Sequence, residues 1–159
     1  MTSIQRRALL LHQHEEHPLY LFALKPAEIL QVASISRVSR DDHGHLIGYQ
    51  RDEVRQHIED IREYLDTGRV LFPNAIILAF DGDGVRFSRS RGPKTDDGLA
   101  LSGSIEIDLP QMHARPPAWI VDGQQRALAL SRTTNTELPV PVVGFMGGGL
   151  ATQRDQFLR

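Results

Sequence analysis

The chain has 159 residues, of which 40% are hydrophobic and 24% are charged, and its formal net charge is −2. This composition is typical of a globular domain with a real core, and it excludes the strong basic field of many nucleic-acid binders. The chain holds no cysteine, so disulfides, thiolate catalysis and cysteine-ligated zinc are excluded. No stretch has the length and apolarity of a signal peptide or a membrane span, and we expect a cytoplasmic protein.

The N-terminal part of the chain predicts two strands and a short helix. Residues 1–7 are polar and basic, and we expect them to be frayed. The apolar runs Ala8–Leu11 and Leu19–Leu24 are typical of short strands. Residues 25–33 predict a helix, because Pro26 suits the first turn of one.

A polar connection rich in histidine joins these two strands. Its ionisable residues are His12, His14, Glu15, Glu16 and His17. A His-x-His pair on a strand would turn both rings to one face, as a metal site requires. Exposed histidine-rich loops are common, however, and no further ligand can be assigned. We therefore predict no metal site in this connection.

A long amphipathic helix is predicted over residues 52–65. Its apolar residues recur at helical spacing, and they are Val54, Ile58, Ile61 and Leu65. Gly68 suits the end of this helix. We expect His57 to be a surface or partly buried residue of the helix.

Four strands are expected further along the chain, over residues 75–80, 85–88, 103–109 and 140–145. The first is apolar throughout, which is typical of a central strand buried on both faces. An Asp-Gly-Asp-Gly turn follows it, and the second strand is expected to return as a hairpin. The third alternates apolar and polar residues, so we expect it to be half-exposed. Pro141 favours an edge position for the last strand.

The most informative stretch runs from Ala118 to Leu130, where a short apolar strand turns at Asp122-Gly123 and continues as a helix. Gln124, Gln125 and Arg126 fall in the first turn of that helix. The start of a helix binds anions because its amides point outward and its dipole is positive, and arginine adds donors suited to phosphate. Asp-Gly before a helix is also an ordinary connection, in which Arg126 would only pair with a surface acid.

The string Asp122-Gly123-Gln124-Gln125-Arg126 resembles the motif of the DGQHR-domain family, with Gln125 where that family usually has histidine. This family includes the DndB-like proteins of DNA phosphorothioation systems. It is thought to be related to the ParB/sulfiredoxin superfamily, whose Gly-x-x-Arg motif lies at a phosphate-binding helix start. Gly123 and Arg126 match that spacing, whereas the lack of cysteine separates this chain from sulfiredoxin chemistry.

A second match to the same family lies upstream, in Tyr49-Gln50-Arg51 followed by His57-Ile58 and Tyr64-Leu65. The resemblance covers most of residues 19–159, loosely outside these motifs. It implies one α/β domain over residues 1–159, with a mixed sheet in the ParB/sulfiredoxin arrangement. Family proteins continue beyond the point where this chain stops, so we expect an N-terminal fragment of a longer protein.

The resemblance implies a nucleotide-binding domain of a bacterial DNA-modification or defence system, with nucleotide hydrolysis left open. Gly123, Gln124 and Arg126 would contact the phosphates. Gln50 and Arg51 precede the long predicted helix as Asp122 and Gly123 precede the later one. Because helix starts that follow strands gather at one edge of an α/β sheet, we expect a shared cleft, with Asn74 facing it.

Asp122 and Gln125 are the residues expected to take part in nucleotide hydrolysis. Asp122 is either the cap of the helix or a ligand of a magnesium-bound water, the nucleotide phosphates supplying other magnesium ligands. Gln125 can orient a water, but it cannot act as the general acid or base that a histidine would be. Mg²⁺ arriving with the nucleotide is the one cofactor that we expect.

Two alternatives stay open. A DNA-binding transcriptional regulator without hydrolysis would need a basic face, for which the best candidates are Arg86, Arg89, Arg91 and Lys94. A similar Asp-Gly-Gln-Gln-Arg string occurs in DUF262-type restriction proteins, which are linked to nucleotide-dependent DNA cleavage. A nuclease would also need a cluster of carboxylates for metal ions, and none stands out. The expected partners are a nucleotide and, in these alternatives, DNA, with no membrane.

Overall fold

The computed structural model describes residues 2–35, 47–112 and 114–147, without the side chains of residues 47–51. It has a mixed α/β fold, as predicted, built on one eight-stranded sheet of order β3-β7-β4-β8-β2-β1-β6-β5. The elements are β1 (Ser3–Leu11), β2 (Leu19–Leu24), the 3-10 helix η1 (Pro26–Glu28), α1 (Ile29–Val32), β3 (Ala33–Ile35), α3 (Ile47–Asp66), β4 (Ile76–Phe80), β5 (Val85–Arg89), β6 (Ala100–Asp108), β7 (Ala118–Asp122), α4 (Gln124–Arg132) and β8 (Val140–Met146).

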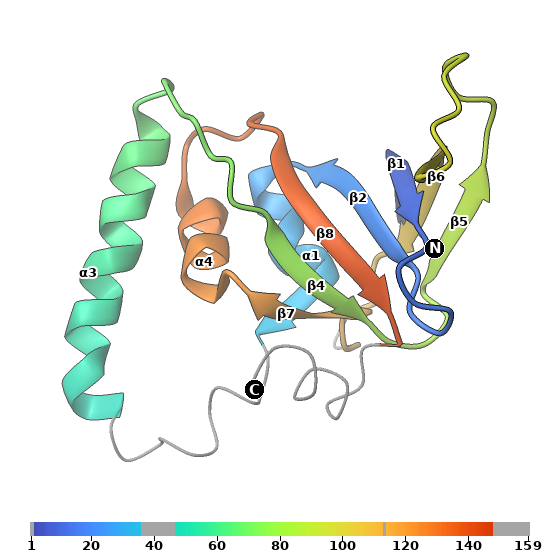
Figure 1. The fold of residues 1–159 in the computed structure, drawn as a ribbon. Coiled ribbons are helices and arrows are strands. Elements are labelled where there is room, and N and C mark those ends of the chain that lie inside the picture. The colour runs from blue at the N-terminus through green and yellow to red at the C-terminus, as the bar shows by residue number, and fades with distance from the viewer. Residues whose placement is uncertain (1, 36–46, 113, 148–159) are drawn as a thin grey trace.

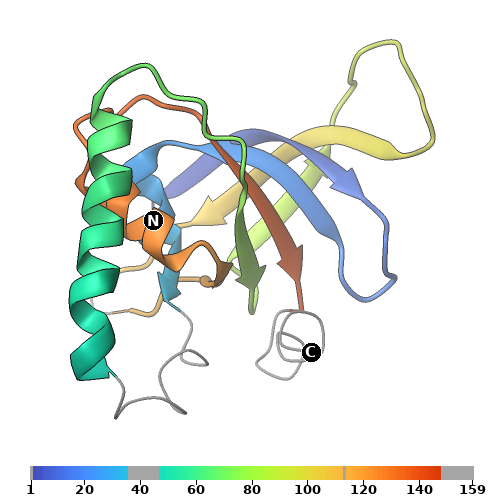
Figure 2. The same cartoon turned by 60° about the vertical axis from the view of Figure 1, so that its left-hand side comes forward.

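The sheet is strongly curved where β2, β1, β6 and β5 lie side by side (Figure 2). Tyr20 of β2 stacks on Phe87 of β5 with ring centroids 5.5 Å apart, although two strands lie between them. Gly103 of β6 allows this contact, because a Cβ atom there would lie 2.5 Å from the Phe87 ring and 2.3 Å from the carbonyl oxygen of Ser88. The close approach of ring and backbone therefore requires glycine at this position.

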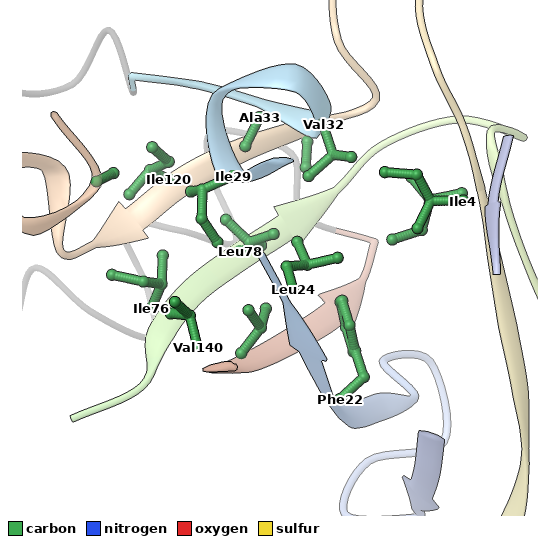
Figure 3. Close-up of a cluster of buried hydrophobic side chains, with 14 of the residues drawn as sticks. Ile4, Phe22, Leu24, Ile29, Val32, Ala33, Ile76, Leu78, Ile120 and Val140 are labelled. Carbon is green, nitrogen blue, oxygen red and sulfur yellow. The ribbon is translucent and has the colours of Figure 1, made fainter. Parts of the chain in front are cut away.

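Helices α1 and α4 pack against the part of the sheet that contains β7 and β4, and α3 stands beside α4 (Figures 1 and 2). Figure 3 shows the side chains that gather between α1 and these strands. Ile29 of α1, Leu78 of β4 and Ile120 of β7 are all fully buried. β4 lies between β7 and β8, which confirms its prediction as a central strand.

Helix α3 ends as predicted but begins earlier. Gly68 has a φ of +75°, and its N–H donates to the carbonyl of Leu65 at 3.3 Å, which is a common way to end a helix. The helix starts at Ile47, so Gln50 and Arg51 lie within it rather than before it, and that prediction was wrong. The side chains of Gln50 and Arg51 lie outside the described residues, so their place in a shared cleft stays a prediction. None of the described helices is long and apolar enough to cross a membrane.

The predicted helix over residues 25–33 is shorter than expected. η1 and one turn of α1 occupy residues 26–32, and the chain is already extended at Ala33, with φ −140° and ψ 147°. There it pairs with β7 in parallel, Ala33 opposite Ala118. This pairing buries Ala33 and adds an edge strand that local sequence does not signal.

Three strand predictions also need correction. Residues 3–7 are not frayed, because β1 begins at Ser3 and pairs with β6 along its whole length. β5 does not form a hairpin with β4 but pairs with β6 at the far edge. β8 lies inside the sheet despite Pro141, which is paired on one side only: it lies opposite Ala23 of β2, and the pairing with β4 begins at the next residue, Val142.

Candidate functional site

A pocket of about 590 Å³ opens between α3, the chain that leads into β4, and the turn from β7 to α4. Its lining residues are His57, Asp60, Ile61, Tyr64, Leu71, Phe72, Pro73, Asn74, Asp122, Gly123, Gln124, Gln125 and Arg126. The whole Asp-Gly-Gln-Gln-Arg motif thus borders one pocket together with Asn74. The pocket has an apolar wall and a polar wall, and the motif forms much of the polar one.

The backbone of the motif is a strand-to-helix turn, as the sequence predicts. Gly123 occupies the N-cap position of α4 with a φ of +99°. The N–H of Ala127 donates to the Gly123 carbonyl at 2.8 Å, so the amides of residues 124–126 precede this intrahelical bond. The prediction of Asp122 as the helix cap was wrong, because Gly123 takes that position. The Asp122 side chain is 64% exposed.

Gly123 is required for close packing as well as for its backbone angle. A Cβ atom there would lie 2.7 Å from Cδ1 of Ile76 and 3.0 Å from a terminal nitrogen of Arg126. A methyl group at residue 123 would therefore displace the fully buried Ile76 side chain and crowd the guanidinium of Arg126. The turn, the start of β4 and Arg126 therefore fit together as one unit.

Arg126 joins three parts of the pocket. Its Nη1 donates to the carbonyl oxygens of Asn74 at 2.6 Å and Ala75 at 3.3 Å, and its Nη2 lies 3.5 Å from the Asp122 carboxylate. The side chain is only 20% exposed. Arg126 therefore holds the chain entering β4 against the β7–α4 turn, a structural role that the sequence did not reveal. Asn74 meets Arg126 through its backbone carbonyl.

The two glutamines of the motif differ in their surroundings. The amide of Gln124 donates back to the carbonyl of Ile120 at 3.3 Å, which helps to fix the turn. Gln125 is partly buried and borders the pocket. Of the pair, Gln125 has the better position to meet a ligand.

Helix α3 supplies a wall of the pocket that the sequence analysis missed. His57, Asp60, Ile61 and Tyr64 recur every three or four residues, so they share one face of the helix. The Tyr64 hydroxyl accepts a hydrogen bond from the N–H of Leu71 at 2.9 Å and donates one to the Leu71 carbonyl at 3.1 Å. This tether holds the apolar segment Leu71–Pro73 beside α3. Helical spacing was the signal that could have grouped these residues.

In the histidine-rich connection between β1 and β2, His14 and His17 contact each other and the backbone. The His14 and His17 rings lie 4.7 Å apart, and Nδ1 of His17 lies 2.8 Å from the carbonyl oxygen of Met146. His14 accepts a hydrogen bond from the N–H of Glu16 at 3.1 Å. Within the described parts of the chain, no group of three or more His, Cys, Asp or Glu residues could hold a metal ion.

The predicted nucleic-acid residues lie at the other end of the sheet, and Arg86 is already bound to acids. Its guanidinium contacts the Glu106 carboxylate, and its Nη2 lies 2.7 Å from the Asp108 carboxylate. These hydrogen bonds hold the pKa of Glu106 and of Asp108 below the usual range and raise the pKa of Arg86. Arg89, at the end of β5, and Arg91 and Lys94, in the β5–β6 loop, are exposed.

Arg91 also lines a groove of about 520 Å³ on the outer face of the curved end of the sheet. Arg7 of β1 contributes a second guanidinium to this groove, and Ser90, Ser102 and Ser104 contribute hydroxyl groups. Register explains part of the grouping, because Arg7 lies opposite Ser104. Among the described residues that line the groove there is no carboxylate.

Fold and site together define a single-sheet α/β domain with a pocket at a strand–glycine–helix turn that carries an arginine. The chain belongs to the DndB family, described as DNA-sulfur modification-associated, whose sequence model matches residues 11–159. This membership confirms the family resemblance and associates the protein with DNA-sulfur modification. Neither the curated proteins nor the solved structures gave a match. The ParB/sulfiredoxin likeness stays a prediction.

Proposed function

We propose that this domain binds a nucleotide in the pocket between α3 and α4, as part of a DNA-sulfur modification system. The observation that carries the proposal is the Gly123–Arg126 turn, whose outward amides and arginine border a pocket of about 590 Å³. A cavity of that size suits a small organic ligand. A cytoplasmic location is part of the proposal, because the DNA to be modified lies inside the cell.

The two walls of the pocket suit the two ends of a nucleotide. The amides of residues 124–126 and the guanidinium of Arg126 would receive phosphate oxygens, with Gln125 as a further donor. The apolar wall would receive the base, and its members are Ile61, Tyr64, Leu71 and Phe72. Tyr64 offers an aromatic ring that is 44% exposed, and Leu71 is 78% exposed.

Magnesium would enter this site with the phosphates. Asp122 is exposed at the mouth of the turn, and its carboxylate is the type of ligand that Mg²⁺ takes directly or through water. Hydrolysis, if this domain performs it, would use Gln125 to orient the attacking water. The proposal also includes Gln50 and Arg51 as further phosphate contacts.

Calorimetric titration of the full chain with ADP and ATP, with and without Mg²⁺, tests the proposal. We expect Arg126→Gln to weaken binding at least tenfold, since it removes a charge-assisted contact to phosphate. Arg132→Gln, at the exposed opposite end of the same helix, is the matched control and should bind as the wild type does.

Arg126→Gln also removes the ties to Asn74 and Ala75, so its melting curve must be recorded beside the titration. Among the described residues, no hydrogen bond of the Gln125 side chain holds this turn, so Gln125→Ala should weaken binding while the melting temperature stays within a few degrees. Wild-type affinity in both Arg126→Gln and Gln125→Ala would overturn the proposal, as would wild-type protein that binds neither nucleotide.

DNA binding is a second candidate function, and the outer groove favours it. Arg7 and Arg91 present two guanidinium groups beside three serine hydroxyls, a set of donors that suits the phosphates of a nucleic-acid backbone. Arg89 and Lys94 extend the same exposed basic segment. The salt dependence of DNA binding tests this second function, as argued in the Discussion.

A further inference from the structure

The ionisable groups of the pocket give a charge that a phosphate ligand would not favour. Asp60 and Asp122 contribute two negative charges, and Arg126 contributes one positive charge that already lies 3.5 Å from Asp122. With His57 neutral, the described lining carries a net charge of −1. A phosphate-bearing ligand therefore needs another positive charge before it can bind well.

Among the lining residues that the structure describes, His57 is the one left that can supply this charge. It lies on the face of α3 that borders the pocket, across from the β7–α4 turn that holds Gln125. Its exposed ring leaves room for a ligand to approach. On α3 the acids near it in sequence are Glu53, one turn earlier, and Asp60, one turn later. Asp122 and Arg126 line the same pocket from the turn, and the segment 71–74 brings no charge.

We infer that His57 is a protonatable ligand contact of this pocket. Its imidazolium brings the described lining to zero net charge and donates a hydrogen bond to a phosphate oxygen. Gln125 cannot change its charge, so the proton-linked contact comes from α3 rather than from the motif. The inference rests on the proposed nucleotide pocket and adds that ligand binding takes up a proton, for which Mg²⁺ is an alternative source of positive charge.

Sulfate without metal is the first probe, because it keeps both charges between pH 6 and pH 8 whereas a terminal nucleotide phosphate titrates in that range. We expect the affinity of the wild-type protein for sulfate to fall on the order of five- to tenfold from pH 6 to pH 8. His57→Gln should bind weakly with no pH dependence. The matched control is His12→Gln, in the exposed β1–β2 connection, which should behave as the wild type does.

Nuclear magnetic resonance gives a second readout that a purely structural role would not produce. Adding sulfate at pH 7 should move the His57 imidazole signals toward their protonated positions, because linkage is reciprocal. Gln125→His places an imidazole on the opposite wall, and in the His57→Gln background it should restore the pH dependence of sulfate affinity.

The outcomes separate this inference from the proposed function. Unchanged pH dependence in His57→Gln, or His57 signals that do not respond to sulfate, would overturn the role of His57. If ADP binds with Mg²⁺ while sulfate affinity does not vary with pH, the nucleotide pocket stands and the His57 contact fails. If neither sulfate nor nucleotide binds under any of these conditions, both fail.

Discussion

Thr133 donates its hydroxyl hydrogen bond to the Asp66 carboxylate, and this contact joins the C-terminal ends of α4 and α3. The same carboxylate accepts the N–H of Thr134 at 2.9 Å and lies 2.6 Å from Arg62 of its own helix. Asn135 adds a bond from its amide to the Leu65 carbonyl at 3.1 Å. These bonds fix α3 against α4, and the pocket lies between those two helices and the sheet.

Acid should weaken this junction. The Thr133 hydroxyl first, then the Thr134 N–H and Arg62, hold the pKa of Asp66 below the usual value of an aspartate. A lowered pKa means that the contribution of Asp66 to stability is complete above the unfolded-state value, near pH 4, and is lost as the pH falls through the folded-state value. The Asp66→Asn variant should therefore unfold at a lower urea concentration than the wild type at pH 7. Between pH 5 and pH 3 it should lose less stability than the wild type does.

Urea unfolding at pH 7, 5 and 3 measures this effect. Asp52→Asn is the matched control, since Asp52 is an exposed residue of the same helix α3. An Asp66→Asn curve that loses stability with acid as steeply as the wild-type curve does would contradict the assigned role of this carboxylate.

Gly123→Ala should destabilise the fold more than Gly68→Ala, although both glycines have a positive φ. The left-handed backbone costs an alanine about 1–2 kcal/mol at either position. At Gly68 nothing lies within 4 Å of the added methyl group, whereas at Gly123 it would lie 2.7 Å from Ile76 and 3.0 Å from Arg126. Overpacking of this kind costs roughly 1–3 kcal/mol more.

Thermal melting of the two alanine variants separates backbone strain from crowding. For a domain of this size, each 1 kcal/mol corresponds to a shift of about 2–4 °C in Tm. We expect the Gly123→Ala variant to melt several degrees below the Gly68→Ala variant and to lose affinity for nucleotide as well. Equal melting temperatures would show that the turn has room for a methyl group.

If the groove lined by Arg7 and Arg91 binds the phosphate backbone of DNA, substitutions at Arg86 and at Arg7 should affect DNA binding differently. Arg7→Gln and Arg91→Gln should each reduce the slope of log affinity against log salt concentration by about 0.9, one phosphate contact each. Arg86→Gln should leave the slope unchanged, because Glu106 and Asp108 already neutralise that guanidinium. Arg55→Gln, on the exposed surface of α3, is a further control.

Fluorescence anisotropy with a labelled duplex at several salt concentrations gives these slopes. A slope that falls with Arg86→Gln but not with Arg7→Gln would move the DNA contact from the outer groove to the edge strand β5. Affinity that does not vary with salt would exclude a backbone contact by this domain.

Local patterns in the sequence predicted the elements whose structure depends on their own residues. The apolar run of β4, the helical periodicity of α3 and the strand–glycine–helix turn at Gly123 were all predicted correctly. The choice of strand partners was not predictable, because β5 and β8 gain their neighbours from contacts far away in sequence. Pro141 misled for that reason, since the cost of a proline depends on which strands it pairs with, and here it pairs with β2 but not with β4.

The candidate site was predictable on one side only. The motif at residues 122–126 has a local signature, and the structure brings Asn74 to it through the Arg126 hydrogen bond. Helical spacing groups His57 and Asp60 on one face of α3, but it does not show that this face borders a pocket, because the same helix also carries residues that face the core, such as Ile58 and Leu65. Only the packing of α3 against α4 decides which face of the helix borders the pocket.

Tyr64→Phe tests whether the tether to Leu71 shapes the pocket. The variant keeps the ring but loses both hydrogen bonds of the hydroxyl to the Leu71 backbone. Because Tyr64 is 44% exposed, water can replace part of these bonds, and we expect the global stability to fall by only about 0.5–1 kcal/mol. The segment Leu71–Asn74 should open more often, since local opening is controlled by its own few contacts.

Hydrogen exchange followed by mass spectrometry measures that opening directly. Amides of residues 70–75 should exchange at least several-fold faster in Tyr64→Phe, while the amides of β1 and β6 keep their wild-type protection. The nucleotide affinity of Tyr64→Phe should also fall, because the ordered apolar wall has to be re-formed each time the ligand binds. Tyr20→Phe is the matched control, since Tyr20 lies in the sheet core against Phe87, away from the pocket. Unchanged exchange over residues 70–75 in Tyr64→Phe would mean that the Arg126 bonds to Asn74 and Ala75 suffice to hold this wall.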